Sequence, residues 1–398
     1  MASSNTLLTP TIIAKEALMM LVNNMAMSRN VHTAYKNEFV KVGTTISVRK
    51  PNKFRATKAQ ARSNSNLVEP STSITMSTQA HVSWAFSSVE LTTTIEDYSK
   101  RYIAPAAAAL ANIVDYDLCG LYADVANSVG EPGTTPATFK SLADAQELLD
   151  DESAPTDRRV CVVNPGAHWA LADGLKGTFA QNVAKDIVTK GYLGTIANLS
   201  IYMDQNIRRH TNGLFEDDIV LNDAAIASGD ASLITAGWGG SSTVAKGDVF
   251  TIADCLACNT MSGASTGKLR QFVVTANTSD DGAAMTIPLA PAFVYGATNA
   301  YSNVTALPAT TKAVTFKGAA GTEYPQNLVF HPNAFALVTV PIEIPANVWG
   351  ARETDPDAGL SIRVVKQYSI ADDEEVIRLD ILYGVKTLYP ELAVRLWG

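Results

Sequence analysis

The sequence predicts a mixed α+β protein in which an antiparallel β domain interrupts an α/β core. Apolar residues spaced for helices and compact apolar strands occupy residues 137–212, and this character returns at Asn327. Between these parts, residues 213–326 are rich in Gly, Ala, Ser, Thr and Asp, with short recurring apolar runs typical of small β domains. Because the flanking pattern resumes after this block, we expect an inserted domain and not a tandem one.

The bulk composition permits a large packed protein with a partly covered surface. The 398 residues allow two or three domains, and 46% of them are apolar. The charged fraction of 18% lies below the roughly one quarter usual for soluble proteins. A subunit covered by neighbours needs fewer charges, although an ordinary Ala-, Ser- and Thr-rich globular protein shows the same composition. Neither a membrane-spanning apolar run nor a secretory signal is evident, so we expect cytosolic synthesis and no membrane partner.

Positive charge is concentrated in one stretch near the N-terminus. From Arg29 to Arg62 there are nine basic residues and one acid, Glu38, so this stretch carries +8 and the rest of the −8 chain carries −16. Such asymmetry favours a basic arm that lies on an acidic neighbour. A nucleic-acid-binding arm is the alternative, but aromatic residues are sparse among these charges, which argues against a base-stacking groove.

The first 91 residues predict a helix followed by a long β hairpin. The helix is expected from Pro10 to about Met27. In the range 43–91, alternating apolar and polar residues predict a strand at each end, and the polar segment 51–66 between them has almost nothing large and apolar to bury. Because such a hairpin is marginal alone in water, we expect the ribbon at 43–91 to gain stability only by clasping another copy of the chain.

The following residues predict a long helix and then alternating helices and strands. An apolar stripe with four-residue spacing predicts the long helix near 98–128, with Pro105 in its first turn. The shorter elements expected after it are a helix at 139–149, a strand at 159–163, a helix at 168–175 and a strand at 198–203. Closing strands are expected near 360–364, 377–385 and 392–396, because apolar and charged residues alternate there.

Several short stretches, in collinear order, carry a resemblance to a known family. They are Ile46–Pro51, Ile103–Pro105, Val162–Pro165, Lys246–Ile252, Gly359–Val364, and Tyr383–Lys386 with Tyr389–Glu391. In this order they resemble the major coat proteins of short-tailed bacteriophages. Those proteins share the Johnson fold, the shell fold of tailed phages and of the herpesvirus capsid floor. The chain is similar to the subfamily that carries an inserted β-barrel domain.

The resemblance implies a division of the chain into parts. These are an N-terminal arm (1–42), an extended hairpin loop (43–91), a peripheral domain with a spine helix (92–136), a central domain in two pieces (137–212 and 327–358), the inserted β domain (213–326) and C-terminal strands (359–398). The hairpin loop would reach over the adjacent subunit. Its expected inter-subunit contacts are the basic residues Arg49, Lys50, Lys53, Arg55, Lys58 and Arg62.

The function implied by the resemblance is that of a major capsid protein. It would self-assemble as hexamers and pentamers into an icosahedral shell that encloses double-stranded DNA without sequence-specific binding. Scaffolding and portal proteins are expected partners, and a decoration protein is a further one. The protein would be located in the virion after assembly in the host cytoplasm. No enzymatic activity, cofactor or metal is expected.

Two alternatives remain open at this point. One is an encapsulin-like shell around enzyme cargo. The other is a thiol- or metal-dependent hydrolase, suggested by Cys161 with His168 and by the CxxC pair Cys255 and Cys258. The second is weaker, because Cys161 lies in an apolar strand and the CxxC pair lacks a second half at zinc-binding spacing.

Overall fold

The chain folds into two compact units, each assembled from three separate stretches of sequence. A computed structural model describes residues 10–35, 45–56, 58, 69–87, 99–175, 193–280, 282, 284–296, 299–355 and 360–398. The first unit takes its residues from Met1–Val48, Ser71–Leu118 and Phe335–Lys386. The second takes its residues from Arg49–Pro70, Cys119–Ala334 and Thr387–Gly398. Helices and strands are mixed in both, which confirms the predicted α+β class.

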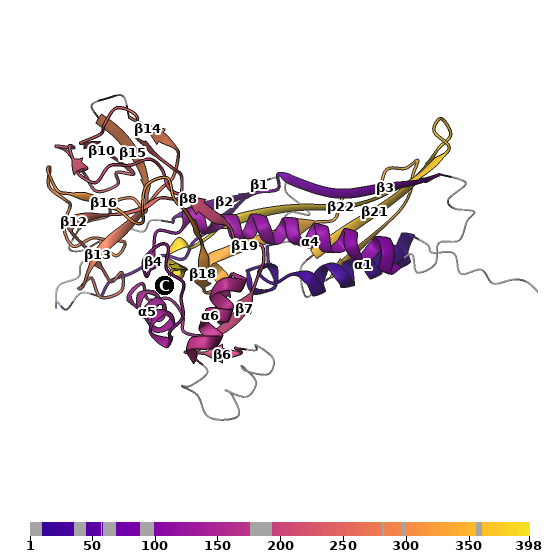
Figure 1. The fold of residues 1–398 in the computed structure, drawn as a ribbon, viewed down its shortest axis with the longest axis horizontal. Coiled ribbons are helices and arrows are strands. Elements are labelled where there is room, and N and C mark those ends of the chain that lie inside the picture. Colours follow the sequence, from indigo (N-terminus) through magenta and orange to yellow (C-terminus); the bar gives the residue numbers. More distant parts are fainter. Residues whose placement is uncertain are drawn as a thin grey trace, which may run out of the picture. The chain divides into compact units, whose positions relative to one another are not determined.

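The first unit is a long antiparallel sheet with two helices. Its strands are β3 (Thr78–Ser87), β19 (Phe335–Val340), β20 (Trp349–Asp355), β21 (Leu360–Ser369) and β22 (Glu374–Thr387). They lie in the order β19-β22-β21-β20, and β3 also pairs with β22. Helix α1 (Pro10–Asn24) packs against β20 and β21, and α4 (Ala104–Cys119) runs along the same sheet (Figure 1). A separate two-stranded sheet joins β1 (Thr45–Arg49) to β2 (Ser71–Thr75).

The ribbon at 43–91 has a partner within its own chain, so the expectation that only another copy supports it is wrong. Strand β3 pairs with β22 along its whole length, from Thr78 opposite Tyr383 to Ser87 opposite Glu374. In this register Val82 faces Leu379 and Trp84 faces Ile377, so the apolar residues of the two strands meet as cross-strand pairs. The predicted hairpin is thus divided between two sheets. Its outer part at 59–68 and the end at 88–91 lie outside the described residues.

The predicted long helix is present but is divided into three types of turn. A π-helical turn covers Ser99–Ile103, α4 follows at Ala104–Cys119, and a 3-10 helix covers Gly120–Asp124. The α-helical part ends immediately before Gly120, a residue of low helix propensity. The apolar stripe predicted from the sequence is buried at Leu110, Val114 and Leu118.

The α/β core of the second unit is a six-stranded sheet. Its strand order is β4 (Ser128–Val129), β23 (Ala393–Leu396), β18 (Asn327–Phe330), β5 (Arg159–Val163), β7 (Leu199–Met203) and β6 (Thr195–Ile196). Helices α5 (Phe139–Asp151) and α6 (Pro165–Leu175) contribute Leu142, Leu149 and Leu171 to its apolar core. The short elements predicted between 139 and 203 are therefore confirmed.

The second sheet of this unit is a closed β barrel. Its strands follow the order β16 (Val314–Phe316), β12 (Val249–Cys258), β13 (Ser265–Val274), β15 (Ala284–Ala290), β10 (Ser232–Ala236) and β9 (Val220–Leu221). The two end strands meet, because the Val314 N–H donates to the Ile219 carbonyl at 2.9 Å and the Leu221 N–H to the Lys312 carbonyl at 2.9 Å. Closure leaves no long open edge. Buried residues from each of its strands, among them Phe250 and Phe272, form its apolar core.

Candidate functional site: the junction of barrel, core and arm

A small apolar cluster joins the barrel to the α/β core within the second unit. Val249 of β12 and Val273 of β13 are buried together with Ala126 and with Trp397, which follows the last strand. Apolar burial of this kind stabilises the contact but does not fix the orientation of the barrel against the core. The polar residues around the cluster fix that orientation through hydrogen bonds and ion pairs.

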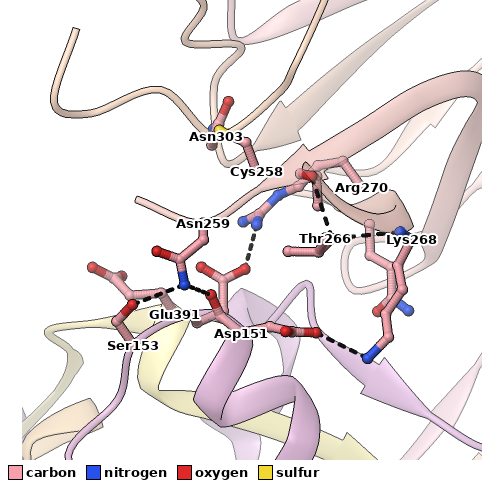
Figure 2. Close-up of polar contacts among 12 residues, drawn as sticks. Asp151, Ser153, Cys258, Asn259, Thr266, Lys268, Arg270, Asn303 and Glu391 are labelled. Atoms are coloured by element: carbon pink, nitrogen blue, oxygen red, sulfur yellow. Dashed lines mark hydrogen bonds and ion pairs between the residues drawn. The ribbon is translucent and has the colours of Figure 1, made fainter. Parts of the chain in front are cut away.

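A buried ion pair lies at the centre of this polar junction. Arg270 of β13, labelled in Figure 2, donates through Nη1 to a carboxylate oxygen of Glu152, the residue that caps the C-terminus of α5. The side chains of Arg270 and Glu152 are only 6% and 9% exposed. Two charges removed from water in this way need each other, because a lone buried charge costs several kcal/mol, on the order of 3–5.

A second, more exposed contact runs between the same two elements. The Lys268 ammonium, two residues before Arg270 on β13, donates to Glu147 Oε1 at 2.8 Å and to Asp151 Oδ2 at 2.9 Å. Partial burial acts to lower the pKa of Lys268, but the hydrogen bonds to the two carboxylates outweigh it and raise that pKa above its ordinary value. The lysine therefore remains a cation held by the end of α5.

Asn259 fixes the end of the β12–β13 hairpin to the same helix. Its Nδ2 donates to the Asp151 carbonyl at 2.7 Å and to Ser153 Oγ at 3.0 Å (Figure 2). Its Oδ1 accepts the N–H groups of Met261 and Ser262 at 2.9 and 3.0 Å, which closes the turn. One side chain thus shapes the hairpin turn and anchors it to the core.

The basic residues predicted as inter-subunit contacts, Arg49 to Arg62 of the hairpin loop, are called the arm from here on. The Lys50 ammonium lies 4.8 Å from the ring centroid of Tyr389, and Lys53 Nζ lies 3.8 Å from Glu391 Oε1. Arg55 Nη2 donates to the Thr260 carbonyl at 3.5 Å. Arg49 pairs with Glu69 at 3.3 Å, with both side chains strongly exposed.

The remaining two arm residues are Lys58 and Arg62. Lys58 is exposed, and Arg62 lies outside the described residues. The contacts of Lys50, Lys53 and Arg55 are made within one chain. The role of the whole set between subunits therefore stays a prediction.

The cysteines considered for a hydrolase are all buried. Burial raises the pKa of the Cys161 thiol to about 12, and burial likewise raises that of Cys255 to about 12, only partly offset by Arg270. Cys258 donates its S–H to the Ser302 carbonyl at 3.0 Å. Because the nucleophile and metal ligand is the thiolate, these neutral thiols are poorly suited to either role. Within the described parts of the chain, no group of three potential metal ligands is gathered.

The junction residues Glu152, Asn259 and Arg270 were not predicted from the sequence. A weak signal was present, because Asp150, Asp151 and Glu152 directly follow the predicted helix at 139–149, and Lys268 and Arg270 are two residues apart in the sequence. Complementary charges alone do not show that a helix and a strand more than a hundred residues apart meet.

No helix in the described ranges has the length and apolarity to cross a bilayer.

The fold of the chain is the capsid shell fold of tailed phages. A solved structure from Mycobacterium phage Che8 is similar over 93% of this chain and 90% of its own, with a TM-score of 0.50 and 14% identity. A capsid of Ralstonia phage GP4 is similar over 90% of this chain and 84% of its own, at a TM-score of 0.43 and 9% identity. A comparison with curated proteins found no match.

The family comparison gives the more specific result. Residues 222–398 match the family of the P22 coat protein, gene protein 5. The matched region contains nearly all of the barrel, Asn259 and Arg270 of the junction, and the C-terminal strands. The chain is a major capsid protein of tailed phages, and the capsid resemblance stated from the sequence is confirmed.

Proposed function

We propose that this capsid protein builds an icosahedral head shell around double-stranded DNA through contacts between the basic arm of one subunit and an acidic face of the next. The observation that carries the proposal is the coat-protein family match over residues 222–398. The shell role explains the low charge fraction, and a structural protein of this class needs no catalytic centre.

The exposure of the outermost arm contacts supports this use of the arm. The Arg49 and Glu69 side chains are 81% and 60% exposed, and pairs this exposed contribute only about 0–1 kcal/mol. Arg49 can therefore exchange its own Glu69 for a carboxylate on a neighbour at little cost. Strength in the shell would come from repetition of such contacts over many subunits and not from any single pair.

The proposed partners follow from the same role. Hexamers and pentamers of the chain would form the shell, with scaffolding and portal proteins during assembly and a decoration protein as a further partner. Outside the basic stretch the chain carries −16, and an acidic inner wall would enclose DNA without holding its phosphates. Assembly would take place in the host cytoplasm, and the product would reside in the virion.

Sedimentation and negative-stain microscopy of the purified full chain test the proposal. We expect large closed or open shells, alone or with a scaffolding protein, that package DNA and not an enzyme cargo. The double variant Arg49→Glu, Lys58→Glu should reduce shell yield at least severalfold, because it reverses charge on the exposed part of the arm. The matched control is Lys140→Glu on α5, whose side chain is 79% exposed and pairs with Asp144 in its own helix. A chain that stays monomeric at high concentration with scaffold present would contradict the proposal.

A further inference from the structure

The first part of the arm, residues 50–56, is called the arm root. It is held in place by contacts other than strand pairing. Residues 50–56 form no strand, yet their backbone amides still need hydrogen-bond partners. The Lys50 N–H donates to the Pro70 carbonyl at 2.8 Å. The Lys53 N–H donates to the Tyr301 hydroxyl of the barrel loop at 3.1 Å.

Tyr301 directs both hydrogen-bonding capacities of its hydroxyl at the arm. The oxygen accepts the Lys53 N–H, and the O–H donates to Asn52 Oδ1 at 3.4 Å. The loop that carries Tyr301 is itself fixed, because the Tyr301 N–H donates to Asn299 Oδ1 at 2.9 Å and the Ser302 hydroxyl to the Gly296 carbonyl at 2.8 Å. A phenol can donate one hydrogen bond and accept another. The Tyr301 hydroxyl therefore contacts two consecutive residues of the arm, as donor to Asn52 and as acceptor from Lys53.

The β12–β13 turn holds the arm at a second point. Arg55 Nη2 reaches the Thr260 carbonyl at 3.5 Å, and its guanidinium lies over Gly263. A Cβ on Gly263 would come within 2.6 Å of Arg55 Cζ, and the φ of +72° at this residue is one that glycine adopts readily. The turn thus has both the backbone conformation and the space that the arginine requires. The same turn is anchored to α5 through Asn259.

We propose that this end of the barrel is a clamp that holds the arm root of its own chain and so sets the direction in which the basic arm leaves the subunit. The clamp consists of Tyr301 and the turn 259–263, and its occupant is the segment 52–55. The role of the directed arm in assembly rests on the proposed function, whereas the clamp itself is a property of a single chain. The inserted domain would then act on assembly without contacting the neighbour that the arm reaches.

Hydrogen exchange of the full chain, kept unassembled at low concentration, tests the clamp. In Tyr301→Phe the amide of Lys53 loses its acceptor, so peptides covering 52–56 should exchange about fivefold faster than in the wild type. The matched control is Tyr295→Phe, whose ring is 45% exposed on a nearby barrel segment and whose substitution should leave these peptides unchanged. Arg55→Ala should speed exchange in both 52–56 and the turn 259–263. Its control is Lys58→Ala, an exposed residue of the same arm that should change neither.

The outcomes separate the clamp from the proposed function. Equal exchange of 52–56 in wild type and Tyr301→Phe, with barrel peptides still protected in both, would overturn the clamp even if the wild type forms shells. Faster exchange only in the two clamp variants supports the clamp even if no shells form. If the clamp directs the arm, shells from Tyr301→Phe should form more slowly or less regularly than shells from Tyr295→Phe.

Discussion

The barrel–core junction and the arm root use the same residue types at different depths. At the junction, the side chains of Arg270 and Glu152 are 6% and 9% exposed. At the arm root, Lys53 and Glu391 are 37% and 26% exposed. A buried charge that loses its partner stays uncompensated, whereas an exposed one is rehydrated and screened. The junction therefore depends on its buried ion pair, whereas the Lys53–Glu391 pair of the arm root contributes little to stability.

The largest effect is expected when the buried pair of the junction is broken. Glu152→Ala leaves the Arg270 guanidinium buried without its carboxylate and should lower the free energy of unfolding by about 3–5 kcal/mol. Glu147→Ala is the matched control, because Lys268 is 42% exposed and keeps Asp151, so a loss of about 0–1 kcal/mol is expected. Urea unfolding of the two variants measures both values. Equal losses would show that burial does not distinguish these pairs.

The first unit offers a test of the same principle through pH. Asp380 is fully buried and accepts hydrogen bonds from Arg363 at 2.7 Å, Arg378 at 2.7 Å and Gln79 at 3.0 Å. Burial acts to raise the pKa of Asp380, but the hydrogen bonds from these partners, Arg363 first, outweigh it and hold that pKa below its ordinary value. Asp380→Asn should cost about 2–3 kcal/mol at pH 7, because two charge-assisted hydrogen bonds are weakened.

The sign of the pH dependence follows from the lowered pKa. Below about pH 4 the unfolded chain binds a proton at this carboxyl before the folded chain does, so the stabilisation by Asp380 is present above that pH. It is lost as pH falls through the folded-state pKa. Unfolding measured from pH 7 to pH 3 should therefore show a steeper loss of stability in the wild type than in Asp380→Asn. Parallel curves for the two proteins would contradict this assignment.

A smaller effect is expected at the half-buried pair of the arm root. Lys53→Ala and Glu391→Ala should each cost about 0.5–1 kcal/mol, with a coupling energy below about 1 kcal/mol in a double-mutant cycle. The pair is long, at 3.8 Å, and both groups retain contact with water. A coupling energy as large as that of Glu152 with Arg270 would remove the distinction between the two regions.

The smallest effect on stability is expected at Arg49. Arg49→Ala should change the free energy of unfolding by less than about 0.5 kcal/mol, because its side chain is 81% exposed. Assembly of the same variant, followed by light scattering, should nevertheless be slower than in the wild type. Raising the salt concentration should slow wild-type assembly more than that of the variant, since exposed charges are screened. Assembly that responds to neither salt nor Arg49→Ala would argue against an electrostatic role of the arm.

Local elements could be predicted from the sequence because their signals are local. Strand β5 coincides with the predicted strand at 159–163, and α5 with the predicted helix at 139–149 to within two residues. The pairing of β3 with β22 could not be predicted in this way, because the partner of Trp84 is Ile377, almost three hundred residues later. The period of each strand was evident, but the choice of partner depends on the tertiary fold.

Of the candidate site, only the concentration of basic residues could be predicted from the sequence. The excess of basic residues from Arg29 to Arg62 was visible, whereas the contacts of Lys53 with Glu391 and of Arg55 with Thr260 were not. The glycine at 263 also carried no signal, because its need for a small residue arises from Arg55, which lies far away in sequence. Such requirements come from close approach in space and appear only when the chain is folded.

In the proposed shell, the exposed part of the arm leaves its own subunit and contacts an acidic face of the next. A cryo-electron microscopy map of the assembled particle, at a resolution that shows side chains, tests this most directly. We expect basic groups of the arm, Arg49 or Lys58 among them, to lie within about 4 Å of a neighbour's carboxylates, while Tyr301 still accepts the Lys53 N–H of its own chain. A shell in which every arm contacts only its own subunit would contradict it.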